Sequence, residues 1–127
     1  MRNTILTLSC LFFLYSFSYG QMTEIQSRNG YEICRGYSSE NQAYIEITSE
    51  LPIPVPPNTA IVYTWTAAHP NGNKVWNTNF PYRAVPIPWV GNYVVQVRVE
   101  YIRKGRKRPF AAFWSNQIVI TGKECLP

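Results

Sequence analysis

The side chains that most enzymes use for proton transfer are scarce in this chain. Its 127 residues contain seven glutamates, no aspartate and a single histidine, His69. A serine or cysteine nucleophile needs a base and usually an orienting acid, whereas His69 precedes Pro70 in a predicted turn, where we expect a solvated side chain. The paired carboxylates of a glycosidase would fall to residues such as Glu46 and Glu100, which take outward positions on predicted strands. The composition therefore argues against catalysis.

Metal-binding patterns are equally weak in the sequence. Calcium sites need several clustered oxygen ligands, and no such acidic cluster occurs in the sequence. Zinc sites need cysteine, histidine or carboxylate ligands at short spacing, which one histidine and widely separated cysteines do not supply. We therefore expect no metal, no cofactor and no catalytic residue.

One charged segment could bind a ligand. Five cations fall within six residues, and they are Arg103, Lys104, Arg106, Lys107 and Arg108. Gly105 among them predicts a hairpin whose tip carries these charges. A basic tip can bind an anionic polysaccharide, a lipid headgroup or a nucleic acid through salt-sensitive contacts. The alternative is a solubilising hairpin whose like charges discourage edge pairing.

Tryptophan is the second candidate contact residue. Trp76, Trp89 and Trp114 exceed what the clear strands need to fill a core. Exposed indoles beside amide side chains form sugar-stacking platforms or protein-docking patches. The alternative is that a core with few leucines uses these rings for bulk.

The first twenty residues are typical of a targeting segment. Arg2 precedes an apolar run over residues 5–14, which is too short for a stable membrane anchor and is followed by Ser18 and Gly20. This pattern predicts a secretory signal peptide over residues 1–20. Its removal takes Arg2 away, lowers the formal net charge from +5 to +4, and leaves one domain over residues 21–127 without a second apolar stretch of spanning length. We expect a secreted protein in an extracellular or periplasmic space.

Export would leave two cysteines, Cys34 and Cys125, in an oxidising compartment where they can pair and stay paired. Closing a loop of about ninety residues stabilises a fold by roughly 4–5 kcal/mol in the chain-entropy model. The alternative is two unpaired buried thiols.

The elements that position these residues are strands. Apolar and polar residues alternate over 93–102, which predicts a half-buried strand with Tyr93, Val95 and Val97 on one face. Similar patterns predict strands at 43–48, at 61–67 around Trp65, and at 117–120 or from Phe110 onward, with short pieces at 31–33 and 82–85. The four core residues that we expect are Trp65, Tyr93, Val95 and Val97.

Turn residues separate these runs. Four prolines over residues 52–57 exclude a central strand there, because each proline removes a backbone donor. Asn71 and Gly72 suit a tight turn with positive backbone angles. With no convincing helical period, the pattern predicts an all-β, antiparallel two-sheet sandwich of about seven strands.

Three short motifs resemble the immunoglobulin-like and PKD-like modules of secreted bacterial surface proteins. They are Cys34 with Gly36, Tyr63 with Trp65, and Gly91 with Tyr93. The resemblance implies an immunoglobulin-like sandwich with the Trp65 indole in the core. An antibody-type domain would have a cysteine two residues after the corner tyrosine, where this chain has Val95. Cys125 is therefore expected to tie the chain end to the region of Cys34.

These features together favour a secreted, non-enzymatic binding or surface-interaction module of the adhesion type. Its expected partner is a protein or polysaccharide at the cell surface, with a polyanion as a further partner of the basic loop. Two alternatives stay open. One is a carbohydrate-binding module led by the tryptophans, and the other is a structural accessory subunit of an extracellular assembly that uses an uncapped sheet edge.

Overall fold

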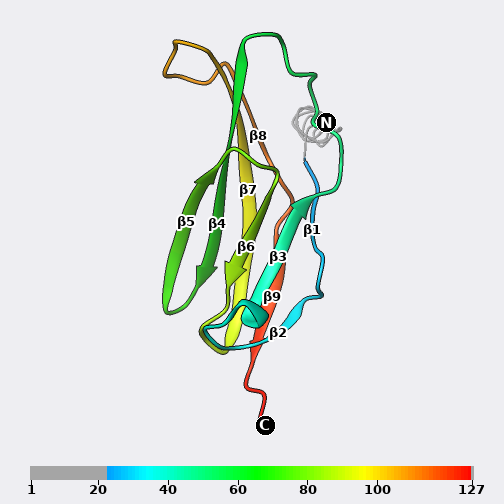
Figure 1. Ribbon diagram of the computed structural model, residues 1–127, viewed down its shortest axis with the longest axis vertical. Helices are drawn as coiled ribbons and strands as arrows, with labels where there is room; N and C mark the ends of the chain where they lie inside the picture. Colours follow the sequence, from blue (N-terminus) through cyan, green and yellow to red (C-terminus); the bar gives the residue numbers. More distant parts are fainter. Residues whose placement is uncertain (1–22, 127) are drawn as a thin grey trace, which may run out of the picture.

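The computed structural model describes residues 23–126, which form nine strands and one short 3₁₀ helix, η1 (Figure 1). The signal peptide expected at residues 1–20 lies outside the described residues. The elements are β1 (Ile25–Ser27), β2 (Glu32–Cys34), η1 (Ser39–Asn41), β3 (Gln42–Ile47), β4 (Thr59–His69), β5 (Gly72–Thr78), β6 (Tyr82–Pro86), β7 (Gly91–Arg103), β8 (Ala111–Trp114) and β9 (Ile118–Lys123).

These strands form two sheets, as the sequence predicts for an all-β sandwich. One sheet has the order β1-β3-β6, and the other has the order β2-β9-β7-β4-β5, with β8 also paired to β7. Every pair is antiparallel except β2 with β9, which is parallel. The parallel pair corrects the purely antiparallel expectation. It arises because the chain turns at Gly30, which has a φ of 96°, and passes from β1 in one sheet to β2 in the other.

The return strand beside β7 is split in two. β9 corresponds to the strand predicted at 117–120, whereas the alternative of one continuous strand from Phe110 is wrong. β8 pairs with β7 near its end and β9 pairs near its beginning. Between them, the Ser115 Oγ accepts a hydrogen bond from the Val97 N–H at 2.9 Å. Thr23 inserts at this break, donating to the Trp114 carbonyl at 3.2 Å and accepting from the Asn116 N–H at 3.1 Å. The backbone of Thr23 therefore forms hydrogen bonds with the Trp114 carbonyl and the Asn116 N–H at the point where the return strand is interrupted.

β1 and β5 were not among the expected strands. The sequence of β5 is largely polar, with two adjacent apolar residues, Val75 and Trp76, instead of an alternation. Its strand conformation follows from pairing with β4 over seven register positions. The turn between them consists of Pro70 and Asn71, and only the following Gly72 has a positive φ, of 149°.

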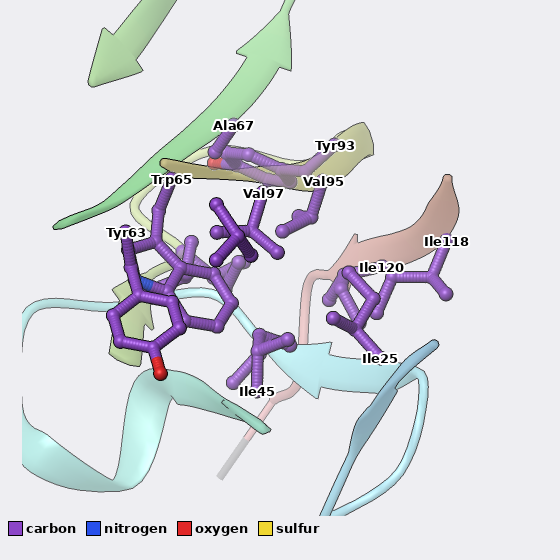
Figure 2. Packing of buried hydrophobic residues seen from close by; sticks show 14 of the residues in the cluster. Ile25, Ile45, Tyr63, Trp65, Ala67, Tyr93, Val95, Val97, Ile118 and Ile120 are labelled. Carbon is purple, nitrogen blue, oxygen red and sulfur yellow. The ribbon is translucent and has the colours of Figure 1, made fainter. Parts of the chain in front are cut away.

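The core lies between the sheets, where alternate residues of β4 and β7 pack against residues of the smaller sheet such as Ile25 and Ile45 (Figure 2). Trp65 pairs in register with Val97, and both are fully buried. The Trp65 Nε1–H donates to the Thr78 Oγ1 at 3.0 Å, so its one polar atom is satisfied inside the fold. Tyr93 and Val95 are also buried, which confirms the alternation that the sequence shows in β7.

A disulfide joins Cys34 at the end of β2 to Cys125 just after β9, with a Cα–Cα distance of 5.4 Å and a sequence separation of 91. Because β2 and β9 are neighbours, the bridge lies within one sheet and does not cross the core. It closes nearly the whole described chain into a loop and holds the parallel pair together.

The proline-rich connection runs from β3 to β4 without a strand of its own, as the sequence predicts. The Tyr101 hydroxyl donates to the Ile53 carbonyl, and the Lys104 N–H donates to the Asn58 carbonyl at 3.0 Å. These bonds fix the connection against the hairpin that follows β7. Within residues 23–126, no helix has the length and hydropathy needed to cross a bilayer.

Loss of the bridge should lower stability without changing the fold. We expect Cys34→Ser with Cys125→Ser to reduce the free energy of unfolding by about 2–5 kcal/mol, because the unfolded chain regains the entropy of an open loop. Urea denaturation followed by tryptophan fluorescence measures this change. If the double variant were as stable as the parent protein with its disulfide intact, the bridge would not be stabilising.

Candidate functional site

A cleft of about 360 Å³ opens beside β5. The β4–β5 turn and the β6–β7 connection that border it lie at the lower end of the sandwich in Figure 1. Its walls come from the β4–β5 hairpin, the connection between β6 and β7, and the segment between β2 and β3. An apolar cleft with a few polar groups is the usual form of a ligand site. We call it the aromatic cleft, and its principal lining residues are Tyr37, Gln42, Lys74, Trp76, Trp89 and Tyr93.

Trp76 enters the cleft from β5. It lies in register with Trp65 of β4, yet Trp65 is fully buried and Trp76 stays partly exposed. The three-stranded sheet ends at β6, which leaves the inner face of β5 incompletely covered. Arg83 of β6 lies against the indole, with its Cζ 4.7 Å from the ring centroid, in a cation–π contact. Trp76 is therefore both held in place and available at the cleft.

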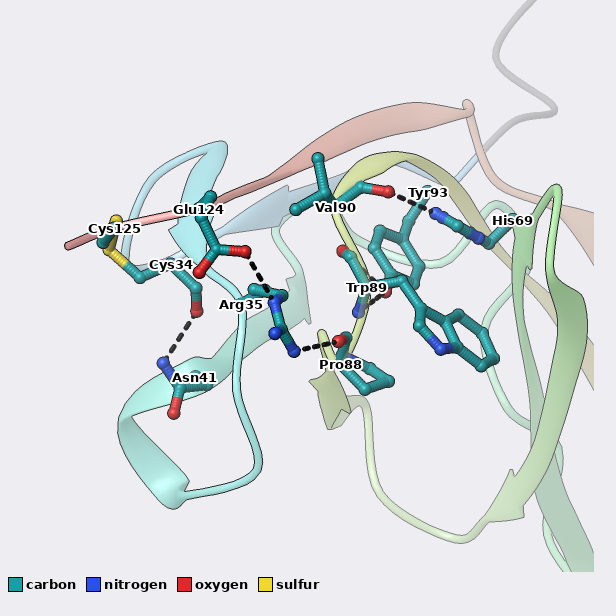
Figure 3. A network of polar contacts seen from close by, with 10 residues as sticks. All are labelled: Cys34, Arg35, Asn41, His69, Pro88, Trp89, Val90, Tyr93, Glu124 and Cys125. Carbon is teal, nitrogen blue, oxygen red and sulfur yellow. Dashed lines mark hydrogen bonds and ion pairs between the residues drawn. A yellow bond between two sulfur atoms is a disulfide. The ribbon is translucent and has the colours of Figure 1, made fainter.

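Trp89 is held on the opposite wall by the hydroxyl of Tyr93 (Figure 3). This hydroxyl accepts a hydrogen bond from the Trp89 N–H at 2.7 Å and donates one to the Trp89 carbonyl at 3.0 Å. Burial raises the pKa of Tyr93, and the bond from Trp89 opposes that rise. The neutral phenol thus fixes the backbone that carries the Trp89 indole.

His69 lies behind this wall and is buried, which corrects the expectation of a solvated turn residue. Its Nδ1 accepts a hydrogen bond from the Asn71 N–H at 3.0 Å, and its Nε2 lies 3.0 Å from the Val90 carbonyl oxygen. Because Nδ1 is an acceptor, Nε2 carries the proton and donates it to Val90. The ring packs 4.4 Å from that of Tyr93. His69 therefore joins the β4–β5 turn to the β6–β7 connection.

Arg35 forms polar contacts beside Pro88, which is one of the residues that line the cleft (Figure 3). Its Nε donates to the Glu124 carboxylate at 3.0 Å and its guanidinium donates to the Pro88 carbonyl at 3.2 Å. The hydrogen bond and charge of Glu124 raise the pKa of Arg35. This side chain thus connects the segment after Cys34 with the connection before β7.

Gly36 is required by the close approach of Asn41. The Asn41 Nδ2 donates to the Cys34 carbonyl at 2.7 Å, and a Cβ on Gly36 would collide with the Asn41 side-chain amide. The Cys-x-Gly motif therefore reflects packing around η1, where a larger residue would displace the Asn41 side chain and its bond to Cys34.

The basic loop, residues 103–108, begins at the last residue of β7 and lies at the other end of the molecule. All five of its cations are exposed, and none forms an ion pair within residues 23–126. Arg103 packs on Phe110, with its Cζ 5.1 Å from the ring centroid. A shallow hollow of about 350 Å³ lies among Arg103, Arg106, Lys107, Arg108 and Phe110.

The three candidate tryptophans do not form one platform. Trp76 and Trp89 share the aromatic cleft, whereas Trp114 lies exposed on β8. The Arg98 Cζ lies 5.6 Å from the Trp114 ring centroid, and Arg98 also pairs with Glu100 at 3.2 Å. Trp114 therefore belongs to a separate surface of the larger sheet.

Sequence reasoning missed four side chains at or beside the cleft: Tyr37, Gln42, Lys74 and Arg83. Lys74 carries a weak signal, since it lies two residues before Trp76 and so shares its face of the strand. The other three come from segments that only the packing of the two sheets brings to β5. Among the described residues, no group of three or more histidine, cysteine, aspartate or glutamate side chains could hold a metal ion.

Comparison with known proteins adds no relative. No protein-family model matches the chain, and neither a curated protein nor a solved structure matches it.

The Tyr93 hydroxyl should be the main support of the cleft wall. Tyr93→Phe leaves the Trp89 N–H and carbonyl without this partner, so we expect a loss of about 1–3 kcal/mol in the free energy of unfolding and a shifted tryptophan emission. Urea denaturation and fluorescence measure both. The matched control is Tyr82→Phe, at an exposed side chain, with a change within about 0.5 kcal/mol. Equal effects at the two positions would contradict this role.

Proposed function

We propose that the chain is an immunoglobulin-like or PKD-like module of the kind found in secreted bacterial surface proteins. This assignment is supported by the packing of the two sheets against each other, one with the order β1-β3-β6 and the other with the order β2-β9-β7-β4-β5. So does the Tyr93 hydroxyl bonded back to Trp89, because a corner tyrosine at the start of a late strand is a hallmark of such sandwiches. The buried Trp65 on β4 is a second hallmark. The bridge within one sheet is a departure from the antibody-type disulfide.

The module is exported and non-enzymatic in this proposal. Export is supported by the signal-like residues 1–20 and by a disulfide, which persists in extracellular or periplasmic space. A binding role without catalysis is supported by His69, the only histidine, because both of its ring nitrogens are engaged in bonds that hold the fold. The function is then to bind a partner at the cell surface.

The observation that carries this proposal is the free edge of β5 beside the aromatic cleft. Within residues 23–126, β5 pairs with β4 alone and ends its sheet. It runs for seven residues without proline, and its Val75 is 60% exposed. Natural proteins usually protect such edges, because their unpaired backbone N–H and C=O groups can form hydrogen bonds with a strand of another chain. The ligand that such an edge would bind is an extended segment of a partner protein.

The geometry of the β4–β5 hairpin says which backbone groups are free. Its two-residue turn makes His69 and Gly72 a hydrogen-bonded pair, and such pairs alternate along an antiparallel ladder. The N–H groups of Asn73, Val75 and Asn77 therefore point away from β4. An added strand gains affinity from these groups, and alternate side chains of that strand gain specificity from the cleft. This arrangement also suits an accessory subunit that joins an assembly through its sheet edge.

A photo-crosslinking residue in place of Asn77 should capture a partner protein in the exported fraction of the native cell. The crosslinked peptide should be an extended segment, identified by mass spectrometry. Val75→Pro should abolish this capture, because proline blocks the free edge, while Val75 contributes no N–H to the ladder with β4. Its melting curve should stay close to that of the parent protein.

The matched control places the same crosslinker at Val119, which is 46% exposed on β9, away from the edge of β5. Capture that survives Val75→Pro, or that is equal from Val119, would refute strand addition at β5. A captured second copy of this chain would show self-pairing of the edge and would also refute a partner protein.

A second candidate function, carbohydrate binding, is favoured by the two indoles in the cleft. Trp76 and Trp89 are partly exposed there, and Lys74 and Gln42 supply polar groups for sugar hydroxyls. A bound glycan should change tryptophan fluorescence, and Trp76→Ala or Trp89→Ala should remove that change. Trp114→Ala is the control, since Trp114 lies outside the cleft. No change across a broad panel of surface polysaccharides would exclude this function.

A further inference from the structure

Two loops that are far apart in the sequence meet at the upper end of the sandwich in Figure 1. One is the basic loop, and the other is the proline loop, residues 51–58. The Lys104 N–H donates to the Asn58 carbonyl at 3.0 Å, and the Tyr101 hydroxyl donates to the Ile53 carbonyl. The ring of Tyr101 also contacts that of Phe110, with centroids 6.0 Å apart. We call the combined surface, residues 51–58 and 103–110, the tip.

The charge of the tip is uncompensated. The ion pairs within residues 23–126 use Arg28, Arg35, Arg98 and Lys123, and none uses a cation of the basic loop. Glu100, on the nearby end of β7, is taken by Arg98. Five cations therefore face solvent together, where they attract an anionic surface through long-range, salt-sensitive forces.

Apolar side chains accompany these charges. Ile53 is 41% exposed, Val55 is 44% exposed and Phe110 is 44% exposed. A loop that only keeps the protein soluble has no use for exposed aliphatic residues beside its cations. Such residues do match the boundary between lipid headgroups and acyl chains, where apolar groups are buried while neighbouring cations contact phosphates.

The prolines make this loop suitable for the interfacial region of a bilayer. Pro52, Pro54, Pro56 and Pro57 have no backbone N–H, so the loop carries fewer donors that would lose water without gaining a partner. Their fixed φ angles also reduce the entropy lost when the loop is immobilised. The Ile53 and Asn58 carbonyls are already satisfied inside the protein.

We propose that the tip docks on an anionic lipid bilayer, with the basic loop on headgroup phosphates and Ile53 and Val55 in the interfacial layer. The tip lies at the opposite end from the aromatic cleft, so this inference does not depend on the proposed function. Docking on a bilayer uses both the cations and the apolar side chains of the tip, whereas binding of a soluble polyanion would need the cations alone.

Sedimentation with lipid vesicles tests the proposal on the purified protein. Binding is expected to vesicles of phosphatidylcholine mixed with phosphatidylglycerol and not to phosphatidylcholine alone. Arg106→Ala with Arg108→Ala should weaken binding at least about tenfold, because each cation near an anionic surface contributes separately. The control, Arg28→Ala with Lys123→Ala, removes the same charge away from the tip and should leave binding nearly unchanged.

The apolar variant separates a bilayer from a soluble polyanion. Ile53→Ser with Val55→Ser should weaken vesicle binding and leave retention on immobilised heparin unchanged. If this variant keeps full vesicle binding while the arginine variant loses both, the tip binds polyanions and bilayer docking is refuted. Absence of binding to the mixed vesicles refutes it directly. Unchanged melting curves exclude misfolding as the cause of a loss.

A fluorophore reports insertion itself. Val55→Cys labelled with an environment-sensitive dye should shift its emission to the blue on mixed vesicles. Val119→Cys is the matched control, since Val119 is 46% exposed but lies on β9, away from the tip. Equal shifts at both positions, or none at Val55, would overturn insertion of the proline loop.

Discussion

The pairing of β4 with β7 is the contact on which the rest of the structure depends. These two strands share ten consecutive register positions, and alternate residues of both point into the core. That register places Trp65 beside Val97 and His69 close to Tyr93. The strand neighbours then follow: β5 attaches to β4, while β8 and β9 attach to β7. A shift of one residue would turn the whole apolar set toward solvent.

The unequal width of the two sheets explains where the protein is open. The smaller sheet ends at β6, so it covers Trp65 but not the full face of β5. Arg83 fills part of the gap by packing on Trp76. The remaining space is the aromatic cleft, and the adjoining backbone of β5 is free. We propose that the protein uses this open side to bind a partner protein and its opposite end to dock on an anionic lipid bilayer.

The candidate sites differ in how far the sequence could predict them. The basic loop is local, because one hairpin contains all five cations, and spacing alone indicates it. The aromatic cleft is assembled from three separate segments of the chain, so its tryptophans could be named but not grouped. His69 shows the limit most clearly: a neighbouring proline suggested a solvated turn, whereas contacts with Val90 and Tyr93 from another strand region bury it.

By itself the sequence determined the strand character of the chain, the inward residues of β7 and the disulfide partners. Each of these depends on local alternation or on a simple count of residues. The tertiary structure decided the parallel pairing of β2 with β9, the split between β8 and β9, and the meeting of the proline and basic loops. Such features arise from hydrogen bonds between segments distant in the chain, and no local pattern encodes which backbone will supply the missing partner.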